Sequence, residues 1–195
     1  MAIYDKFAPY YDKLFKPFET RFLNQWRREA LSNLPTSATI LEIGSGTGAN
    51  FPFYPESKIA VSSEISEQMI KIAAQKTDSA ILIQADAQDL PFPPNSFDAA
   101  FATLVFCSIP DPAKAFYELR RVVKPGGMIV LLEHVRPPRL LGLLFDFLNI
   151  FTTFLIDDHF NRQTAKLAAE HGLAPVGVTK KAAGIINIIV CVNKK

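Results

Sequence analysis

Three glycines in a short loop are the first residues in this chain whose type and spacing could serve chemistry. Gly44, Gly46 and Gly48 follow the apolar run ILEI, where a strand is expected to turn into a helix. Missing side chains at such positions let a ligand approach the backbone amides and the start of the helix. Glu64 lies 20 residues beyond Gly44, the distance at which a carboxylate meets the two hydroxyls of a ribose. Together these residues indicate an adenosine-containing ligand, although a plain tight turn would also use the glycines.

The spacing of the glycines distinguishes only partly between NAD and other adenosine-containing ligands. A dinucleotide-binding loop has its third glycine three positions after the second, and Ala49 stands there in this chain. Because alanine is a permitted variant, the loop disfavours NAD without excluding it. Asp86 is a second carboxylate at the end of an expected strand and could accept a hydrogen bond from an adenine amino group. Capping of its own loop is an equally good explanation of Asp86.

Further polar residues follow the next two expected strands. Leu104 to Ser108 come after one of them, and Glu133 and His134 end the other. In an open parallel sheet, ligands bind beyond the carboxyl ends of the strands, so all these residues should face one edge. The candidates for a general base are Glu133, His134, Asp157, Asp158 and His159. For each of them a structural role is the more ordinary explanation.

The elements that must position these residues alternate between strand and helix. Apolar runs predict strands over 37–43, 58–64, 80–86, 97–109 and 128–134. Helical periodicity covers 18–34, 66–76, 112–127 and 162–171, with Ser66 as a predicted N-cap. Residues 174–194 predict two further strands around the turn AAG. The fold class is therefore α/β, a Rossmann-like doubly wound sheet of about seven strands, mostly parallel with an antiparallel C-terminal strand.

Length and composition narrow the organisation of the chain. Its 195 residues predict a single domain, 1–195, with a helical N-terminal cap over 1–36 and a core over 37–195 that carries a hydrophobic insertion near 138–160. The formal net charge of +2 gives no reason to expect a nucleic-acid partner. Cys107 and Cys191 lack metal-binding spacing, so we expect buried thiols and no metal site.

The most hydrophobic stretch of the chain covers residues 140–156. It is 17 residues long and contains Asp146 and Asn149, whereas a spanning helix normally needs ~20 apolar residues. We therefore expect either a lid over the acceptor or a helix that contacts a membrane surface. The N-terminus lacks the pattern of a signal peptide. These features predict a cytoplasmic protein that could work at the inner face of a membrane.

Four segments, taken in order, resemble a known family. ILEIGSGTGAN, VSSEISEQMI, ADAQDLPFPPNSFDAAF and RRVVKPGGMIVLLEHV cover roughly residues 38–135, and together they are similar to the motif set of class I S-adenosylmethionine-dependent methyltransferases. The N-terminal YDKFAPYYD also resembles the segment that closes over the cofactor in the ubiquinone/menaquinone-methyltransferase-like and phospholipid-methyltransferase-like branches. The resemblance implies S-adenosyl-L-methionine as the cofactor and a helical N-terminal lid.

The same resemblance assigns roles to individual residues. It implies cofactor contacts from Tyr11, Glu42, Gly44, Ser45, Gly46, Gly48, Glu64, Ile65, Met69, Asp86, Ala87 and Leu104. Glu42 and the loop would hold the methionine portion, Glu64 the ribose, and Asp86 the adenine edge. The chain departs from the family where Ser62 and Ser63 replace the usual glycine-containing end of the second strand. That departure leaves the ribose contact intact and makes the local turn less certain.

The C-terminal half of the chain carries the resemblance that indicates the acceptor. That half is similar to membrane-associated thiol methyltransferases and, more weakly, to phospholipid N-methyltransferases, which implies a small or lipid-like hydrophobic substrate. Methyl transfer is a direct displacement and needs no protein nucleophile, so His134, His159 and Glu133 are the candidates for contact with the acceptor. Two other functions stay open, an NAD-linked oxidoreductase and a non-catalytic adenosine-binding or membrane-associated protein.

Overall fold

The computed structural model describes residues 13, 17, 19–136 and 162–195. Its helical elements are η1 (Glu19–Leu23, a π-helical turn), α2 (Asn24–Leu31), η2 (Phe51–Phe53), α3 (Glu67–Ala73), α4 (Pro112–Val122), α6 (Thr164–Glu170) and η3 (Ala182–Gly184). Its strands are β1 (Thr39–Ile43), β2 (Ile59–Glu64), β3 (Ile81–Gln84), β4 (Phe97–Thr103), β5 (Val123–His134), β6 (Leu173–Lys181) and β7 (Ile186–Asn193).

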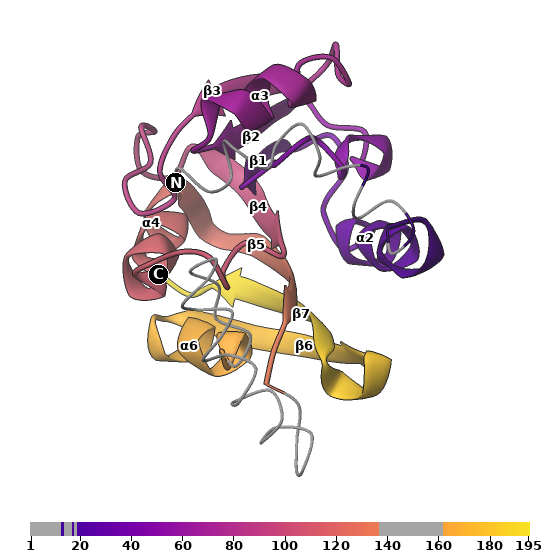
Figure 1. The fold of residues 1–195 in the computed structure, drawn as a ribbon. Coiled ribbons are helices and arrows are strands. Elements are labelled where there is room, and N and C mark those ends of the chain that lie inside the picture. The colour runs from indigo at the N-terminus through magenta and orange to yellow at the C-terminus, as the bar shows by residue number, and fades with distance from the viewer. Residues whose placement is uncertain (1–12, 14–16, 18, 137–161) are drawn as a thin grey trace.

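All seven of these strands belong to one sheet with the order β3-β2-β1-β4-β5-β7-β6 (Figure 1). Strands β1 to β5 run parallel to one another, and β7 is antiparallel to both β5 and β6. The prediction of a mostly parallel sheet with an antiparallel C-terminal strand is confirmed. The predicted terminal hairpin is also present, because η3 joins β6 to β7 at the AAG turn.

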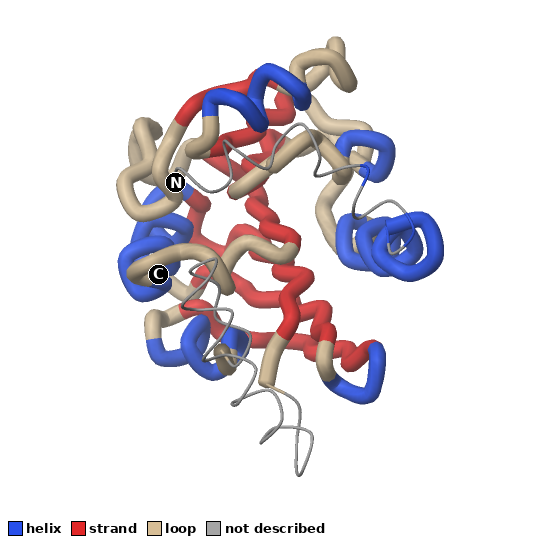
Figure 2. Tube along the Cα trace, viewed as in Figure 1, coloured by secondary structure: helices blue, strands red, loops and turns tan. Residues whose placement is uncertain are grey.

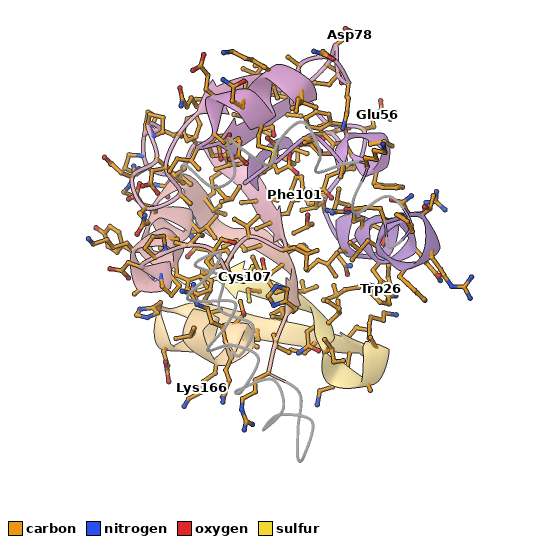
Figure 3. All side chains as sticks on the ribbon, viewed as in Figure 1. Trp26, Glu56, Asp78, Phe101, Cys107 and Lys166 are labelled. Atoms are coloured by element: carbon orange, nitrogen blue, oxygen red, sulfur yellow. The ribbon has the colours of Figure 1, made fainter. Side chains whose placement is uncertain are left out.

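Helices cover the sheet on both sides (Figure 2). One apolar cluster joins α4 and α6 to the sheet and includes the wholly buried Phe116 and Leu131. A second cluster packs Ala30 and Leu31 of α2 against Phe101 and other strand residues on the opposite side. Figure 3 shows the labelled Phe101 side chain directed toward α2. Burial of strands on both faces explains why their sequences are nearly continuous apolar runs.

The largest differences from the predicted element boundaries are at the end of β4 and at the junction of α4 and β5. The fourth strand was expected over 97–109 but ends at Thr103, because Leu104 adopts a left-handed backbone with φ of 58°. The helix expected over 112–127 ends at Val122, and β5 begins at once with Val123, so Pro125 and Gly126 lie in the first part of a strand. In both places the apolar periodicity continues past the turn in the backbone.

The remaining predictions on composition concern thiols, metals and membrane spans. Cys107 and Cys191 are buried and not in a disulfide, as expected. Within the described ranges, no helix is long and apolar enough to cross a membrane. The same ranges hold no group of three or more His, Cys, Asp or Glu side chains that could bind a metal ion. The hydrophobic segment 140–156 lies outside the described residues.

Candidate functional site

The candidate site lies at the carboxyl ends of β1, β2 and β4. Strand order reverses at β1, because the chain passes from β1 to β2 and β3 on one side and returns to β4 and β5 on the other. The loop after β1 carries the three glycines, and β2 ends at Glu64. In doubly wound sheets this reversal point is where ligands bind. The elements therefore bring the sequence-predicted glycines and carboxylate to one place.

The glycine loop turns sharply as it leaves the sheet. The amides of Gly44 and Ser45 both donate to the carbonyl of Ser63, at 2.8 and 3.0 Å. Gly44 has φ of +67°, and a Cβ on it would lie 2.6 Å from a methyl carbon of Val105. Gly46 has φ of +53°, and no heavy atom of the described residues lies within 4 Å of where its Cβ would be. The loop is therefore tight on its β4 side and open at Gly46, where a ligand can reach the backbone.

Glu64 is held beside this loop by backbone amides. Its Oε2 accepts a hydrogen bond from the amide of Gly46 at 2.8 Å, and its Oε1 accepts from the amides of Ile65 and Ser66 at 2.9 Å. Its relative exposure is 9%. A carboxylate offers about four acceptor positions, so the three amides leave about one position of Glu64 for a ribose hydroxyl. Three fixed donors hold the group in one orientation before any ligand binds.

The predicted adenine contacts follow Glu64 along the chain. Ser66 caps α3 by accepting from the amide of Met69 at 3.2 Å, as predicted, and Met69 is buried. Ile65 is half-buried beside it. Asp86 accepts from the amide of Gln88 at 2.8 Å and from its side chain, so it caps its own loop, and its contact with adenine stays a prediction. Ala87 is half-buried and packs against the core cluster.

Glu42 is wholly buried at the end of β1. Its Oε1 accepts from the Asn50 side chain at 2.5 Å, and its Oε2 accepts from Ser62 at 2.6 Å and from the Tyr54 hydroxyl. Burial raises the pKa of the Glu42 carboxyl, while the hydrogen bonds and the positive charge of Arg27 lower it. The same burial, together with Glu42, raises the pKa of Tyr54. Glu42 therefore lies within the sheet and binds Asn50, the residue that directly follows the glycine loop.

A buried polar network extends from Glu42 to α2. Asn50 connects Glu42 to Thr103 of β4 and to Arg27 of α2. Sequence reasoning did not assign a site role to Arg27, Asn50, Tyr54, Ser62 or Thr103. These five residues come from four separate stretches of chain, so no short-range spacing could identify them as one group. The one available signal is Asn50, which directly follows the glycine loop.

The residues predicted for the acceptor side occupy the ends of β4 and β5. The amide of Leu104 donates to the carbonyl of Leu132 at 2.7 Å. Glu133 has no exposed surface, and its Oε1 accepts from the amides of Val105 and Phe106 at 3.0 and 3.2 Å. Glu133 therefore anchors the loop after β4. His134 is the last residue of β5 and is 9% exposed.

The other predicted site residues lie outside the described part of the chain: Tyr11, Asp157, Asp158 and His159. The predicted lid segment before Lys13 also lies outside it.

Two features of the loop fit an S-adenosylmethionine-sized ligand. The hydroxyl of Ser45, between two glycines, is buried and has no hydrogen-bond partner among the described residues. Buried polar groups are normally paired, so this hydroxyl is suited to a polar group of a ligand. The space beside Gly46 is open next to the Glu64 carboxylate. The residues present would thus hold an adenosine-containing cofactor without rearrangement of the sheet.

Comparison with known proteins gives a consistent family. Residues 41–131 match the family model described as "Methyltransferase domain". The chain is 33% identical over 145 residues to a demethylmenaquinone methyltransferase of Bacillus licheniformis, covering 70% of this chain and 62% of that protein. It is 31% identical over 145 residues to thiol S-methyltransferase TMT1B of Homo sapiens, covering 68% and 59%. The chain thus spans about 60% of the length of these relatives.

Among solved structures, a chain from Haloferax volcanii aligns with a TM-score of 0.79 and 18% identity. The alignment covers 98% of each chain, and that structure is a complex between the Trm112 methyltransferase activator and a methyltransferase. At this identity the likeness is one of fold.

Proposed function

We propose that this chain, a member of the class I S-adenosylmethionine-dependent methyltransferases, transfers the methyl group of S-adenosyl-L-methionine to a small or lipid-like hydrophobic acceptor. The acceptor atom is the sulfur of a thiol or the amine of a phospholipid. The observation that carries the cofactor side is the Glu64 carboxylate, fixed 2.8 Å from the Gly46 amide at the point where strand order reverses.

The chain's own residues bind and orient the cofactor. Glu64 accepts a hydrogen bond from the ribose, the open face of the loop at Gly46 contacts the methionine portion, and Ile65 and Met69 flank the adenine. Ser45 supplies a hydroxyl that has no other partner. When bound, the cofactor supplies an electrophilic methyl group on a positively charged sulfur. Fixing the donor in one orientation is most of what a direct displacement requires.

The acceptor enters from the side of β4 and β5. The Glu133 carboxylate accepts hydrogen bonds from the amides of Val105 and Phe106, in the loop that begins at Leu104. We therefore propose a positioning role for Glu133 rather than proton transfer. His134 ends β5 at the same edge, and we propose that it contacts the acceptor together with His159. An acceptor thiol has to lose its proton, and a neutral imidazole is a suitable base near neutral pH.

A hydrophobic acceptor has support from two relatives. One is named for action on demethylmenaquinone and the other for action on thiols. We further propose that the protein is cytoplasmic and acts at the inner face of a membrane, with residues 140–156 as either a lid or a membrane-contacting segment. Co-sedimentation with vesicles of neutral and anionic lipid tests the membrane contact, and a folded protein that stays in solution with every vesicle would contradict it.

The experiment that tests the function is methyl transfer from radiolabelled S-adenosylmethionine. We would offer an alkyl thiol, phosphatidylethanolamine vesicles and demethylmenaquinone as acceptors, with NAD and a secondary alcohol as a separate assay for hydride transfer. Label in the organic phase with the thiol or the phospholipid is the expected result. Label with the quinone alone would move the acceptor to a ring carbon. Binding of the cofactor without transfer to any acceptor would favour a non-catalytic adenosine-binding protein.

A further inference from the structure

The two ends of the glycine loop are joined by a buried side-chain hydrogen bond. Glu42 lies two residues before Gly44, and Asn50 directly follows Ala49. The amide nitrogen Nδ2 of Asn50 donates to Oε1 of Glu42 at 2.5 Å and to the hydroxyl of Thr103 at 2.8 Å. Glu42 is 0% exposed and Asn50 is 2% exposed. The loop is therefore closed at its base inside the protein.

Arg27 of α2 completes this closure from another element. Its Nη1 donates to Oδ1 of Asn50 at 2.8 Å and also to the Thr103 hydroxyl. The carbonyl oxygen of Asn50 accepts from Arg27 and its nitrogen donates to Glu42. Only one orientation of the Asn50 carboxamide makes both hydrogen bonds. Arg27 is 5% exposed.

The other edge of the Arg27 guanidinium binds η1. Nε and Nη2 donate to the two carboxylate oxygens of Glu19 at 3.2 and 2.8 Å. The planar guanidinium thus binds Asn50 along one edge and Glu19 along the other. A lysine ammonium reproduces this arrangement poorly. η1 is a π-helical turn, and such turns are frequent at functional sites.

We propose that Arg27 is a positioning residue of the cofactor site, which clamps the base of loop 44–49 through Asn50 and couples the loop to η1. The identity of the ligand rests on the proposed function, but the clamp is a property of the protein alone. Removing the guanidinium would leave Asn50 Oδ1 buried without a donor, and the carboxamide could then turn away from Glu42. The positive charge of Arg27 also favours the ionised form of Glu42.

Arg27→Met tests the clamp, with Arg28→Met as the matched control. Arg28 is the next residue of α2, is exposed, and lies over the Phe53 ring instead of in the network. We would measure amide hydrogen exchange in the protein without ligand. The expected result is exchange at least about tenfold faster for residues 44–50 in Arg27→Met, with little change for residues 128–134 of β5. Arg28→Met should leave both regions as they are.

Unchanged exchange of the loop in Arg27→Met would overturn the proposal. An equal acceleration in β5 would also overturn it, because Arg27 would then serve overall stability alone. If Arg27→Met fails to fold, Arg27→Lys carries the same test, with a smaller but still loop-confined acceleration expected.

A second readout separates this inference from the proposed function. S-adenosylmethionine should bind Arg27→Met about 10-fold or more weakly than the wild type, and Arg28→Met within about twofold of it. Equal binding to wild type and Arg27→Met would contradict a positioning role. Failure of the wild type to bind S-adenosylmethionine would instead count against the proposed function, and loop exchange would still decide the clamp.

Discussion

Gly44 and Gly46 are two residues of one loop that meet different surroundings. Both have positive φ, but a Cβ on Gly44 would lie 2.6 Å from Val105, whereas a Cβ on Gly46 would meet nothing within 4 Å. We expect Gly44→Ala to lower the free energy of unfolding by about 2–4 kcal/mol, because backbone strain and overpacking add. Gly46→Ala should lose only about 1–2 kcal/mol from strain. Urea denaturation measures both changes.

Val105→Ala supplies the control for this difference. In the double variant Gly44→Ala with Val105→Ala, both methyl contacts are absent and only the Cβ of residue 105 remains, at 3.3 Å. The cost of Gly44→Ala should therefore fall toward that of Gly46→Ala. Equal losses for the two glycines in the wild-type background would show that the contact with Val105 does not matter. Cofactor affinity should respond in the opposite order, because only the Gly46 methyl group would enter the space assigned to the ligand.

At the residue scale, local spacing predicted part of the site. The glycines and Glu64 could be predicted because a loop and a carboxylate about 20 residues apart are tied by a single strand–helix–strand step. Arg27 and Thr103 could not, because they meet through Asn50 only after α2 and β4 pack on the sheet. Glu133 was expected near the acceptor, and its contacts with two loop amides follow from a turn at Leu104 that sequence periodicity does not encode.

At the element scale, Glu118 and Arg121, an ion pair within α4, hydrogen-bond that helix to the loop before β4. Glu118 of α4 accepts from the amide of Leu90 at 2.8 Å and from Arg121 at 2.7 Å, and Arg121 donates to the carbonyls of Leu90 and Phe92. The hydrogen bonds from Arg121 lower the pKa of Glu118 below 4.5. We expect Glu118→Gln to cost about 1–3 kcal/mol of unfolding free energy at pH 7.

The pH dependence of this loss has a defined sign. Since the pKa of Glu118 is lower in the folded protein than in the unfolded chain, its stabilisation is present above about pH 4.5 and is lost as pH falls through and below that value. The difference between wild type and Glu118→Gln should therefore shrink in acid. Glu67→Gln is the control, because its ion pair with Lys71 is largely exposed and should contribute under about 1 kcal/mol at any pH. A difference that stays constant down to pH 3 would contradict the assignment.

Element boundaries were predictable where a backbone signal coincides with the end of a pattern. Gly172, with φ of +82°, terminates α6 as expected. The end of β4 was not predicted, because Leu104 enters the left-handed region without glycine and apolar residues continue to Ile109. Those residues pack as a loop against α4, where Phe106 stacks on Phe116 at 4.4 Å between ring centroids.

At the scale of the whole molecule, Cys191 reports on the integrity of the sheet. It lies in β7 between β5 and β6 with no exposed surface, and burial raises the pKa of its thiol to about 12. In a Cys107→Ser variant, iodoacetamide at pH 8 should leave Cys191 unmodified in the native protein and modify it fully in denaturant, because the thiolate is the reactive form. Mass spectrometry of the alkylated protein measures this. Rapid modification without denaturant would contradict the central position of β7.

The α/β architecture of the whole molecule could be predicted because alternating apolar strands and amphipathic helices allow few arrangements. The position of β7 between β5 and β6 is a pairing choice that strand composition alone does not determine. The acceptor depends on side-chain shape at the edge of β4 and β5, which no spacing of residues encodes.

Calorimetric titration of S-adenosylmethionine, S-adenosylhomocysteine and NAD tests the central claim most directly. We expect the wild type to bind the first two and not NAD. Glu64→Ala should weaken that binding about 10- to 100-fold, the effect of losing charge-assisted hydrogen bonds to the ribose. Glu67→Ala, three residues away and exposed, should bind like the wild type. Binding of NAD alone, or equal affinity in Glu64→Ala and the wild type, would contradict the cofactor site proposed at the glycine loop.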